Sequence, residues 1–268
     1  MLYFVATPIG NLEDISLRAI SVLKTCDIIA CEDTRHSKIL LDKYDIKTKT
    51  IAYHKFNELN SADGIIKLLN EGKNVAVVSD AGMPVISDPG NILTTKLREL
   101  NMDFTVIPGA NAGLSALILS GFDASKFAFF GFLSEKNKEL KQQLEEIRSF
   151  YGTSIIYSSK YNVNNDLLSL YSTLGNTRVA IVSEITKLHE KTEIVTLPYS
   201  LDEPKGEYVL VVENAKKEET KITDNDLIKE LKDLLKTSTK QDAFKTLQLK
   251  YNLTKSYIYN LYEKNKSK

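Results

Sequence analysis

Short apolar runs that alternate with helical patterns are the feature that most narrows the folds open to this chain of 268 residues. The runs in its first part lie at residues 3–6, 28–31, 50–53, 75–78 and 104–107. Apolar residues recur between them at helical spacing, near residues 17–25, 37–44, 62–70 and 92–100. Strands that alternate with helices are typical of βαβ units. The pattern predicts an α/β domain with a mainly parallel sheet at residues 1–121, because Ser120-Gly121 ends a further helix near residues 112–119.

A second α/β segment is predicted to follow. Its strand-like runs lie near residues 154–157, 178–182, 193–197 and 208–212, and its helical patterns lie near residues 139–150 and 165–174. The turn-rich segment 198–206 joins the last two runs, which is typical of a mixed sheet with hairpin connections. We therefore expect a C-terminal α/β domain with a mixed sheet at residues 122–215. The cleft between the two domains is the expected ligand site.

Residues 216–268 differ from the rest of the chain in charge. They hold 13 Lys and 8 acidic residues, whereas the remainder holds 22 basic and 27 acidic residues. Apolar residues at helical spacing begin at Leu227, and shorter helical patterns follow at residues 241–249 and 255–262. The pattern predicts a basic helical extension that resembles a helix-turn-helix. Lys and Tyr together suit contact with RNA phosphates and bases, and a solvated helical tail is the alternative.

Composition favours a globular protein outside the membrane. Hydrophobic residues make up 43% and charged residues 26% of the chain. No apolar run approaches the roughly 20 residues that span a bilayer, and the chain enters a strand pattern without a basic leader, so we expect a cytoplasmic protein with no membrane partner. Cys26 and Cys31 flank an apolar run and lack metal-type spacing with the three His residues. We expect two reduced core residues and no metal site.

The loop Ser79–Gly90 is the strongest candidate for ligand binding. It follows an apolar run that is typical of a buried parallel strand, and α/β proteins bind ligands at the carboxyl ends of such strands. Two Pro and two Gly set its backbone, while two Ser-Asp pairs offer carboxylates that accept hydrogen bonds. The alternative is a plain connection in which Ser87 or Asp88 caps the next helix.

Other polar loops follow the remaining strands of the first domain. The first loop lacks the Gly patterns of dinucleotide and triphosphate sites, which disfavours hydride transfer and phosphate-loop hydrolysis. Glu32 to Arg35 form either a structural ion pair with a helix cap or part of the cleft. The loops comprise residues 7–15, Glu32-Asp33-Thr34-Arg35, His54 with Asn57 and Glu58, and Pro108-Gly109-Ala110-Asn111-Ala112.

These loops and several later motifs resemble the 16S rRNA cytidine 2′-O-methyltransferases of the tetrapyrrole methylase superfamily. The resemblance extends from residue 2 to about residue 213. Met83-Pro84 stands where relatives commonly have Thr-Pro, and Ala110-Asn111 stands where they have Pro-Ser. The motifs are residues 5–12 with Asp14-Ile15, Glu32 to Arg35, His54 with Asn57-Glu58, Ser79 to Gly90, Pro108-Gly109, Gly131-Phe132-Leu133, Glu184 with Thr186-Lys187, and Lys205-Gly206-Glu207.

The resemblance implies a homodimer of two-domain α/β chains that binds S-adenosyl-L-methionine in its interdomain cleft. It further implies that the protein methylates the ribose of a cytidine in the decoding region of 16S rRNA, within the 30S subunit. The positions carried over for the cofactor are Pro8, Asp80, Gly82, Pro84, Asp88, Asn111, Ala112, Phe132 and Leu133.

Methylation of a ribose hydroxyl requires an aligned acceptor that loses its proton during attack. We hypothesise that Asp14, Glu32, Asp33, His54 and Glu58 orient or deprotonate the hydroxyl, and that Arg35, Asn57, Lys187 and Lys205 contact the RNA. Two other functions fit the sequence: a methyltransferase for a tetrapyrrole-like small molecule, and a non-catalytic RNA-binding protein of ribosome assembly.

Overall fold

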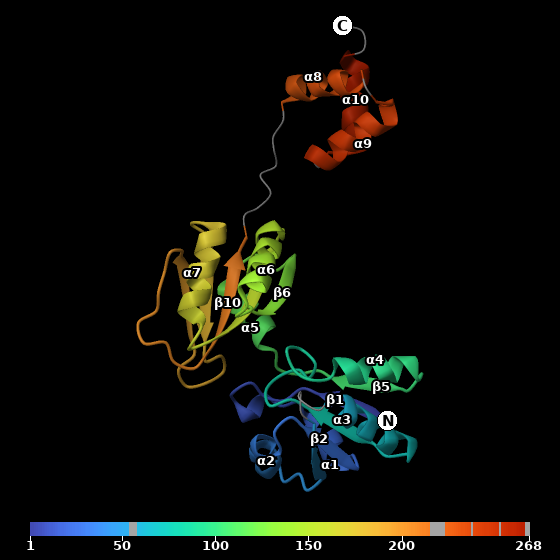
Figure 1. The fold of residues 1–268 in the computed structure, drawn as a ribbon, viewed down its shortest axis with the longest axis vertical. Coiled ribbons are helices and arrows are strands. Elements are labelled where there is room, and N and C mark those ends of the chain that lie inside the picture. The colour runs from blue at the N-terminus through green and yellow to red at the C-terminus, as the bar shows by residue number, and fades with distance from the viewer. Residues whose placement is uncertain (54–57, 215–222, 237, 252, 266–268) are drawn as a thin grey trace. The chain divides into compact units, whose positions relative to one another are not determined.

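The computed structural model describes residues 1–53, 58–214, 223–236, 238–251 and 253–265. Its chain divides into two compact units, Met1–Asn214 and Ala215–Lys268. The first unit contains two five-stranded sheets with helices on their faces (Figure 1), which confirms the predicted α/β fold. The division into domains after residues 121 and 215 stays a prediction.

The first sheet is entirely parallel and has the strand order β3-β2-β4-β1-β5. β4 lies between β1 and β2 and is buried along its whole length, as its Val-Ala-Val-Val sequence leads one to expect. Because the strands are parallel, their carboxyl ends share one edge, from which the polar loops emerge. The strands are β1 (Leu2–Val5), β2 (Ile28–Cys31), β3 (Lys49–Ala52), β4 (Val75–Val78) and β5 (Phe104–Ile107).

Helices cover both faces of this sheet. One face packs Leu23 and Leu40 against Ile29, whereas the other packs Ile65 and Leu93 around Phe4 and its neighbours. Alternate residues of the same strand enter opposite cores, which is the pattern of a doubly covered sheet. The first face carries α1 (Leu17–Thr25) and α2 (Thr34–Lys43), and the second carries α3 (Glu58–Asn70) and α4 (Asn91–Glu99).

Both cysteines lie in the core beside α1, as predicted. Cys26 is 8% exposed and Cys31 is fully buried, and neither forms a disulfide. Burial raises the pKa of the Cys26 thiol to about 11, so this thiol stays protonated at neutral pH.

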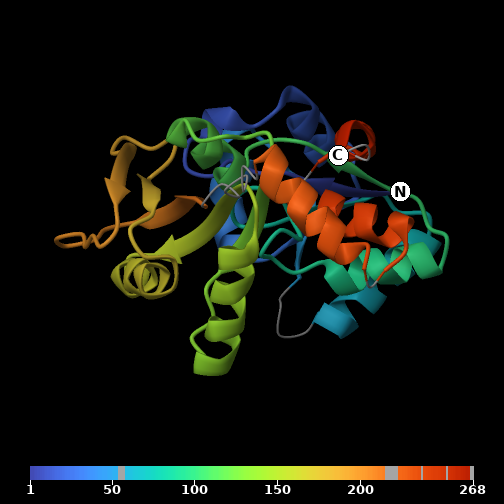
Figure 2. The same cartoon turned by 90° about the horizontal axis from the view of Figure 1, so that it is seen from above.

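The second sheet is mixed and has the order β6-β7-β10-β8-β9. β6 and β7 are parallel, and the other neighbouring pairs are antiparallel. Its outer strand β9 forms the far edge (Figure 2, orange-brown, left). The strands are β6 (Phe127–Phe132), β7 (Thr153–Ser159), β8 (Arg178–Ser183), β9 (Lys191–Thr196) and β10 (Glu207–Glu213).

The expected hairpin across residues 198–206 is wrong. β9 pairs only with β8, and the segment 198–206 carries the chain past β8 so that β10 enters between β7 and β8. The central position suits β10, whose Tyr208 to Val212 are all buried. A strand whose apolar side chains are all buried is more stable between two neighbouring strands than at the edge of a sheet, where its backbone groups would be unpaired on one side.

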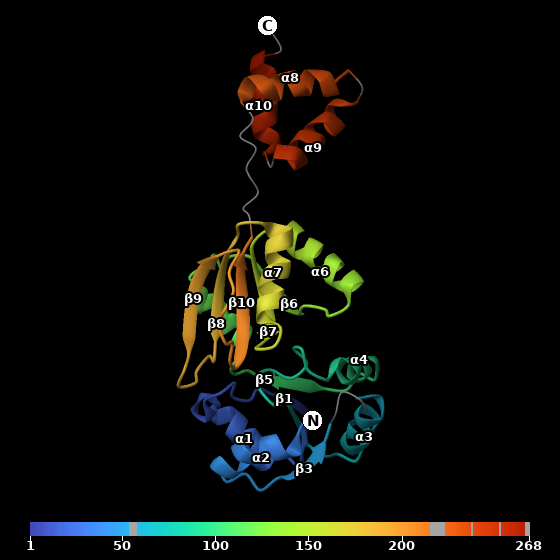
Figure 3. The same cartoon turned by 60° about the vertical axis from the view of Figure 1, so that its left-hand side comes forward.

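The helices of the second sheet lie on opposite faces. α5 (Ala112–Ser120) packs Ala116 and Leu117 against one face. α6 (Asn137–Ser149) and α7 (Val163–Leu174) pack against the other face and against each other (Figure 3).

Unit Ala215–Lys268 contains three helices in its described residues: α8 (Asp224–Leu234), α9 (Lys240–Tyr251) and α10 (Lys255–Asn265). Leu227, Phe244 and Ile258, one from each helix, meet in a small core. The helical patterns predicted from residue 227 onward are therefore present. Within the described residues, no helix combines the length and the apolar character that a bilayer span requires.

Neighbouring leucines of α7 test the core of the second sheet. Leu167 is fully buried, whereas Leu168 is 63% exposed. We expect Leu167→Ala to lower the free energy of unfolding by about 2–5 kcal/mol, because it removes buried methyl groups and leaves a cavity. The matched control Leu168→Ala should change it by less than about 0.5 kcal/mol. Urea unfolding measures both, and equal losses would contradict the packing described above.

Candidate functional site

The loop after β4 is fastened to the loop after β1. The Thr7 amide donates to the Gly82 carbonyl at 2.9 Å, and the Gly82 amide donates to the Thr7 carbonyl at 3.1 Å. The Thr7 hydroxyl also donates to the Ser79 carbonyl at 3.2 Å. These bonds satisfy backbone groups that no helix or sheet ladder serves, and they hold the Ser79–Gly90 loop at the sheet edge.

The same loop contains unusual backbone conformations. Val85 and Ser87 have φ of 77° and 67°, in the left-handed region that residues other than glycine seldom adopt and that β-branched residues such as Val adopt least. A Cβ on Gly90, where φ is 141°, would lie 2.6 Å from Val85 Cγ2. Strain of this kind persists where the surrounding structure enforces it, often at ligand sites.

Ser87 and Asp88 have a place beyond a plain connection between β4 and α4. Gly90 is the N-cap residue of α4. Ser87 and Asp88, which precede it, line a cavity of about 360 Å³. The cavity lies between the carboxyl edge of the first sheet and the ends of β6, β7 and β10, and its other lining residues include Ile9, Glu32, Asp80, Met83, Asn111, Ala112, Phe132, Tyr157, Ser158, Glu184, Lys187 and Glu207.

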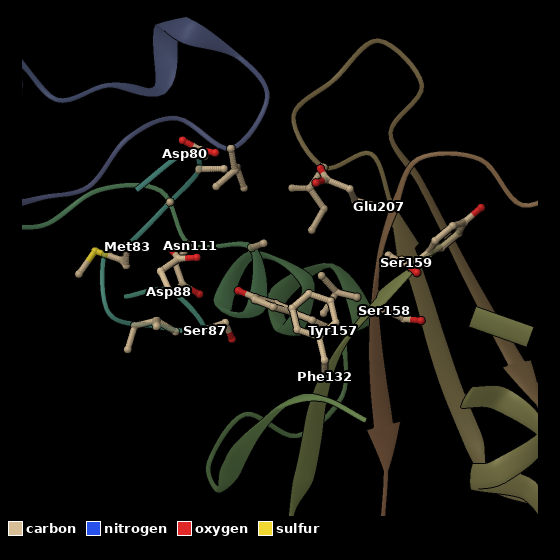
Figure 4. A pocket seen from close by; sticks show the side chains of 18 of the residues that line it. Asp80, Met83, Ser87, Asp88, Asn111, Phe132, Tyr157, Ser158, Ser159 and Glu207 are labelled. Atoms are coloured by element: carbon tan, nitrogen blue, oxygen red, sulfur yellow. The ribbon is translucent and has the colours of Figure 1, made fainter. Parts of the chain in front are cut away.

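Figure 4 shows how the two sheets contribute to this cavity. Asp80, Met83 and Asn111 extend from the loops of the first sheet, and Tyr157 and Glu207 face them from the second. Asn111 has a second role, because its Oδ1 accepts from the Leu114 amide at 2.9 Å and caps α5.

Carboxylates dominate the charge of the cavity. Glu32, Asp80, Asp88, Glu184 and Glu207 line it, and among the described residues Lys187 is the single cation that does so. The Asp33 amide donates to Asp80 Oδ1 at 3.0 Å, which orients the Asp80 side chain across from the end of β2. A surplus of negative charge in a partly enclosed cavity favours a positively charged ligand.

The charge of Lys187 is partly neutralised by its neighbours. Its Nζ lies 3.1 Å from Glu184 Oε1 and 3.0 Å from Glu207 Oε2. Burial opposes the charged form of Lys187, but the hydrogen bonds to the two carboxylates outweigh it and raise the pKa of this ammonium. Lys187 therefore stays protonated at neutral pH and can donate to a ligand.

Two aromatic rings form an apolar wall. The ring centroids of Phe132 and Tyr157 lie 5.7 Å apart in an edge-to-face arrangement. The Gly113 amide donates to the Tyr157 hydroxyl at 3.2 Å, and burial raises the pKa of that hydroxyl. Phe132 is 57% exposed, so a flat ligand group could cover it.

Most residues predicted for the cofactor line this cavity. Asp80, Gly82, Asp88, Asn111, Ala112 and Phe132 do so. Pro8 lines an adjoining cavity. Pro84 and Leu133 line neither cavity: Pro84 is buried, and Leu133 packs into the core of the second sheet.

The residues predicted to act on the hydroxyl are spread more widely. Glu32 lines the cavity, whereas Asp14 accepts a hydrogen bond from the Thr186 hydroxyl. The Asp33 carboxylate accepts from the Arg35 amide and guanidinium, both at 2.8 Å, so the ion pair with a helix cap is confirmed for these two residues. These bonds hold the pKa of Asp33 well below its usual range. His54, Asn57 and the side chain of Glu58 lie outside the described residues.

The predicted RNA contacts Arg35 and Lys205 are exposed at the surface. Arg35 pairs with Asp33, and Lys205 lies 3.5 Å from Glu203. Lys187 instead lines the cavity.

Several cavity residues were missed by the sequence analysis. Tyr157, Ser158 and Ser159 end β7, and the Ser158 hydroxyl donates to Asp166, a carboxyl whose pKa burial raises. Applying the strand-end rule to the second sheet would have found them. Glu184 and Glu207 occur in the motifs, but their place in the site depends on the position of β10.

The residues 1–199 match the family model described as Tetrapyrrole (Corrin/Porphyrin) Methylases. Because this match covers most of the chain, the protein belongs to that family. It is an S-adenosylmethionine-dependent methyltransferase.

Curated relatives are more specific in name. The chain is 37% identical over 275 residues to "Ribosomal RNA small subunit methyltransferase I" of Bacillus subtilis, with 98% of this chain and 94% of the relative covered. It is 44% identical over 217 residues to the protein of that name from Halalkalibacterium halodurans, covering 79% of this chain and 75% of the relative. A crystal structure of diphthine synthase aligns with a TM-score of 0.64 at 12% identity, over 80% of this chain and 90% of that one, and shows likeness of fold.

Gly206 tests the contact that holds Glu184. A Cβ at Gly206 would lie 2.2 Å from Glu184 Oε1, the atom that accepts from Lys187 and from the Glu207 amide. We expect Gly206→Ala to displace this carboxylate and to lower the free energy of unfolding by about 1–3 kcal/mol through lost hydrogen bonds.

The matched control is Gly72→Ala. Gly72 has the same φ of 79° but no neighbour within 4 Å of a new Cβ, so it isolates backbone strain. The two variants should differ in urea unfolding by that amount. Equal losses in the two variants would contradict the idea that a Cβ at residue 206 displaces the Glu184 carboxylate.

Proposed function

We propose that this protein methylates the ribose 2′-oxygen of a cytidine in the decoding region of 16S rRNA, within the 30S subunit in the cytoplasm. The observation that carries the proposal is the acidic cavity between two sheets in a chain whose relatives carry the name of an rRNA methyltransferase. The motif resemblance narrows the target to cytidine and the position to the 2′-oxygen.

The cavity suits S-adenosylmethionine. When bound, this cofactor supplies a methyl group on a positively charged sulfur. Asp80 and Asp88 offer negative charge to the sulfonium and hydrogen-bond acceptors to hydroxyl and amino groups. Phe132 offers an apolar face to an aromatic base. The residues present therefore fit the group that the family implies.

The acceptor hydroxyl requires a base and an orientation. Of the described carboxylates proposed for this role, Glu32 is the one that lines the cavity. Asp33 is poorly suited to take a proton, because Arg35 lowers its pKa. Asp14 is engaged with Thr186. We therefore assign deprotonation or orientation of the hydroxyl to Glu32 among these residues, and contact with the RNA to Lys187.

Methyl transfer from labelled S-adenosylmethionine tests the proposal against its two alternatives. We expect label in 16S rRNA of 30S subunits and none in a porphyrinoid. The labelled position should resist alkaline cleavage, because a 2′-O-methyl group removes the nucleophile that cleaves the adjacent phosphodiester. Label in the porphyrinoid alone would select the small-molecule enzyme, and binding without transfer would select the assembly protein.

A pair of variants tests the cofactor site by calorimetry. Asp80→Asn keeps the size of the side chain but removes its charge, so cofactor affinity measured by calorimetry should fall about tenfold, which corresponds to about 1.4 kcal/mol. Asp103→Asn, at an exposed residue outside the cavity, should leave it unchanged.

The helical unit at residues 215–268 is proposed to bind RNA. Its 13 Lys residues can neutralise phosphates and release counterions, which makes binding fall with salt. Truncation after Asn214 should weaken RNA affinity about tenfold or more and flatten the dependence of log K on log salt, by about 0.7 for each lost single-strand phosphate contact. Cofactor affinity should not change. If RNA affinity and its dependence on salt are the same in the truncated protein, residues 215–268 do not bind the RNA.

A homodimer is part of the proposal. α5 exposes Leu114 and Ile118, one turn apart, at 47% and 79%. Apolar side chains that share an exposed helix face suit a second copy. Sedimentation equilibrium measures the mass of the protein in solution. A mass equal to that of one chain would contradict the proposed homodimer.

A further inference from the structure

A second cavity, of about 660 Å³, adjoins the cavity that the proposed function assigns to the cofactor. The two cavities share Ile9, Asp80, Ala81, Lys187 and Glu207. Beyond this shared wall, the second cavity extends along α2 and the loop after β1. We call it the α2 cavity, and its distinguishing residues are Leu12, His36, Ser37, Ile39 and Leu40.

We propose that the α2 cavity binds the target nucleotide, with its pyrimidine base taken out of the RNA stack and its ribose at the shared wall. This inference rests on the proposed function and assigns the substrate subsite of that reaction. Enzymes that act on a base take it out of the stack into a pocket. A ribose hydroxyl lies outside the stack, but here it has to reach a partly enclosed cavity, and moving the whole nucleotide out of the strand brings it there. The volume falls within the 300–1,000 Å³ typical of small-ligand pockets.

The walls of the α2 cavity suit the faces of a base. Ile39 is 60% exposed although it belongs to an otherwise amphipathic helix. Leu12 is half-buried and Leu40 is buried, so these side chains form an apolar surface next to a polar opening. A base has two apolar faces and a polar edge, and it gains from contact with such a surface when it leaves the stack.

A buried hydroxyl offers a partner for the edge of the base. Ser37 is 7% exposed, and among the described residues its Oγ has no oxygen or nitrogen hydrogen-bond partner. Burial raises the pKa of the neighbouring Cys31 thiol, and a hydrogen bond with the Ser37 hydroxyl opposes that shift. A thiol is only a weak hydrogen-bonding group, so the capacity of the hydroxyl is unmet. A buried polar atom without a partner calls for a ligand or a water.

The shared wall suits a ribose. Its ammonium group, on Lys187, is a hydrogen-bond donor, and its carboxylates, on Asp80 and Glu207, are hydrogen-bond acceptors. A ribose hydroxyl both donates and accepts, so it can be held between these groups. A nucleotide with its base in the α2 cavity therefore has its sugar where the cofactor cavity begins.

Ile39→Trp tests the proposal, because the larger side chain narrows the α2 cavity without lining the cofactor cavity. We expect KM for 30S subunits to rise at least about tenfold while the Kd for S-adenosylmethionine stays within about twofold. Leu168→Trp is the matched control, since Leu168 is 63% exposed on α7 and lines neither cavity. An unchanged KM in Ile39→Trp, or equal effects of the two variants, overturns the inference.

Ser37→Ala provides a milder variant that keeps the fold. We expect the ratio of kcat/KM for cytidine over uridine at the target position to fall about tenfold, while cofactor affinity is retained. An unchanged ratio overturns the assignment of Ser37 to the base edge.

Extrusion of the base is measured separately from catalysis. In 30S subunits reconstituted with 2-aminopurine next to the target cytidine, the wild-type protein should raise the fluorescence, and Ile39→Trp should remove most of that rise. No rise with bound wild-type protein overturns the inference even if methyl transfer occurs. A rise without methyl transfer supports the cavity and counts against the proposed reaction, so the two failures are distinguishable.

Discussion

The paired hydrogen bonds between Thr7 and Gly82 are the contact on which the site depends. They join the loops after β1 and β4, whose strands are neighbours in the sheet. The loop held in this way contains non-glycine residues with positive φ, and such conformations cost about 1–3 kcal/mol each. These hydrogen bonds hold a loop in which Asp80 precedes Gly82 and in which Ser87 and Asp88 follow it. All three residues line one cavity.

Charge is divided between the two units of the chain. Carboxylates line the cavity in unit Met1–Asn214, and the lining residue Lys187 is paired with Glu184 and Glu207. Lysines are concentrated instead in residues 216–268. An acidic cavity attracts a sulfonium but repels a phosphate backbone, so a protein that handles both needs the two charges apart. In the proposed function Lys187, held by Glu184 and Glu207, contacts a single group of the RNA.

Long and strongly patterned elements could be predicted from the sequence. The buried strands β2 and β4 and the polar loops after them follow from local apolar runs and turn residues, which act over a few positions. The order of the second sheet could not be predicted in this way. No residue next to Tyr208 in the sequence indicates that β10 enters between β7 and β8, because that position is decided by pairing with residues 25 to 60 positions earlier.

The residues of the site show the same difference between local sequence signals and long-range contacts. The sequence by itself determined an α/β chain with loops of Gly, Pro, Ser and Asp at parallel strand ends, since turn chemistry and hydrophobic period are written in neighbouring residues. Only the tertiary structure decided which carboxylate faces the cavity. Asp33 caps its own helix while the adjacent Glu32 lines the cavity, and Glu207 joins Lys187 from a strand that the sequence placed elsewhere in the sheet. Contacts between residues far apart in the chain settle such roles, because hydrogen-bond partners and burial depend on where the sheets bring side chains together.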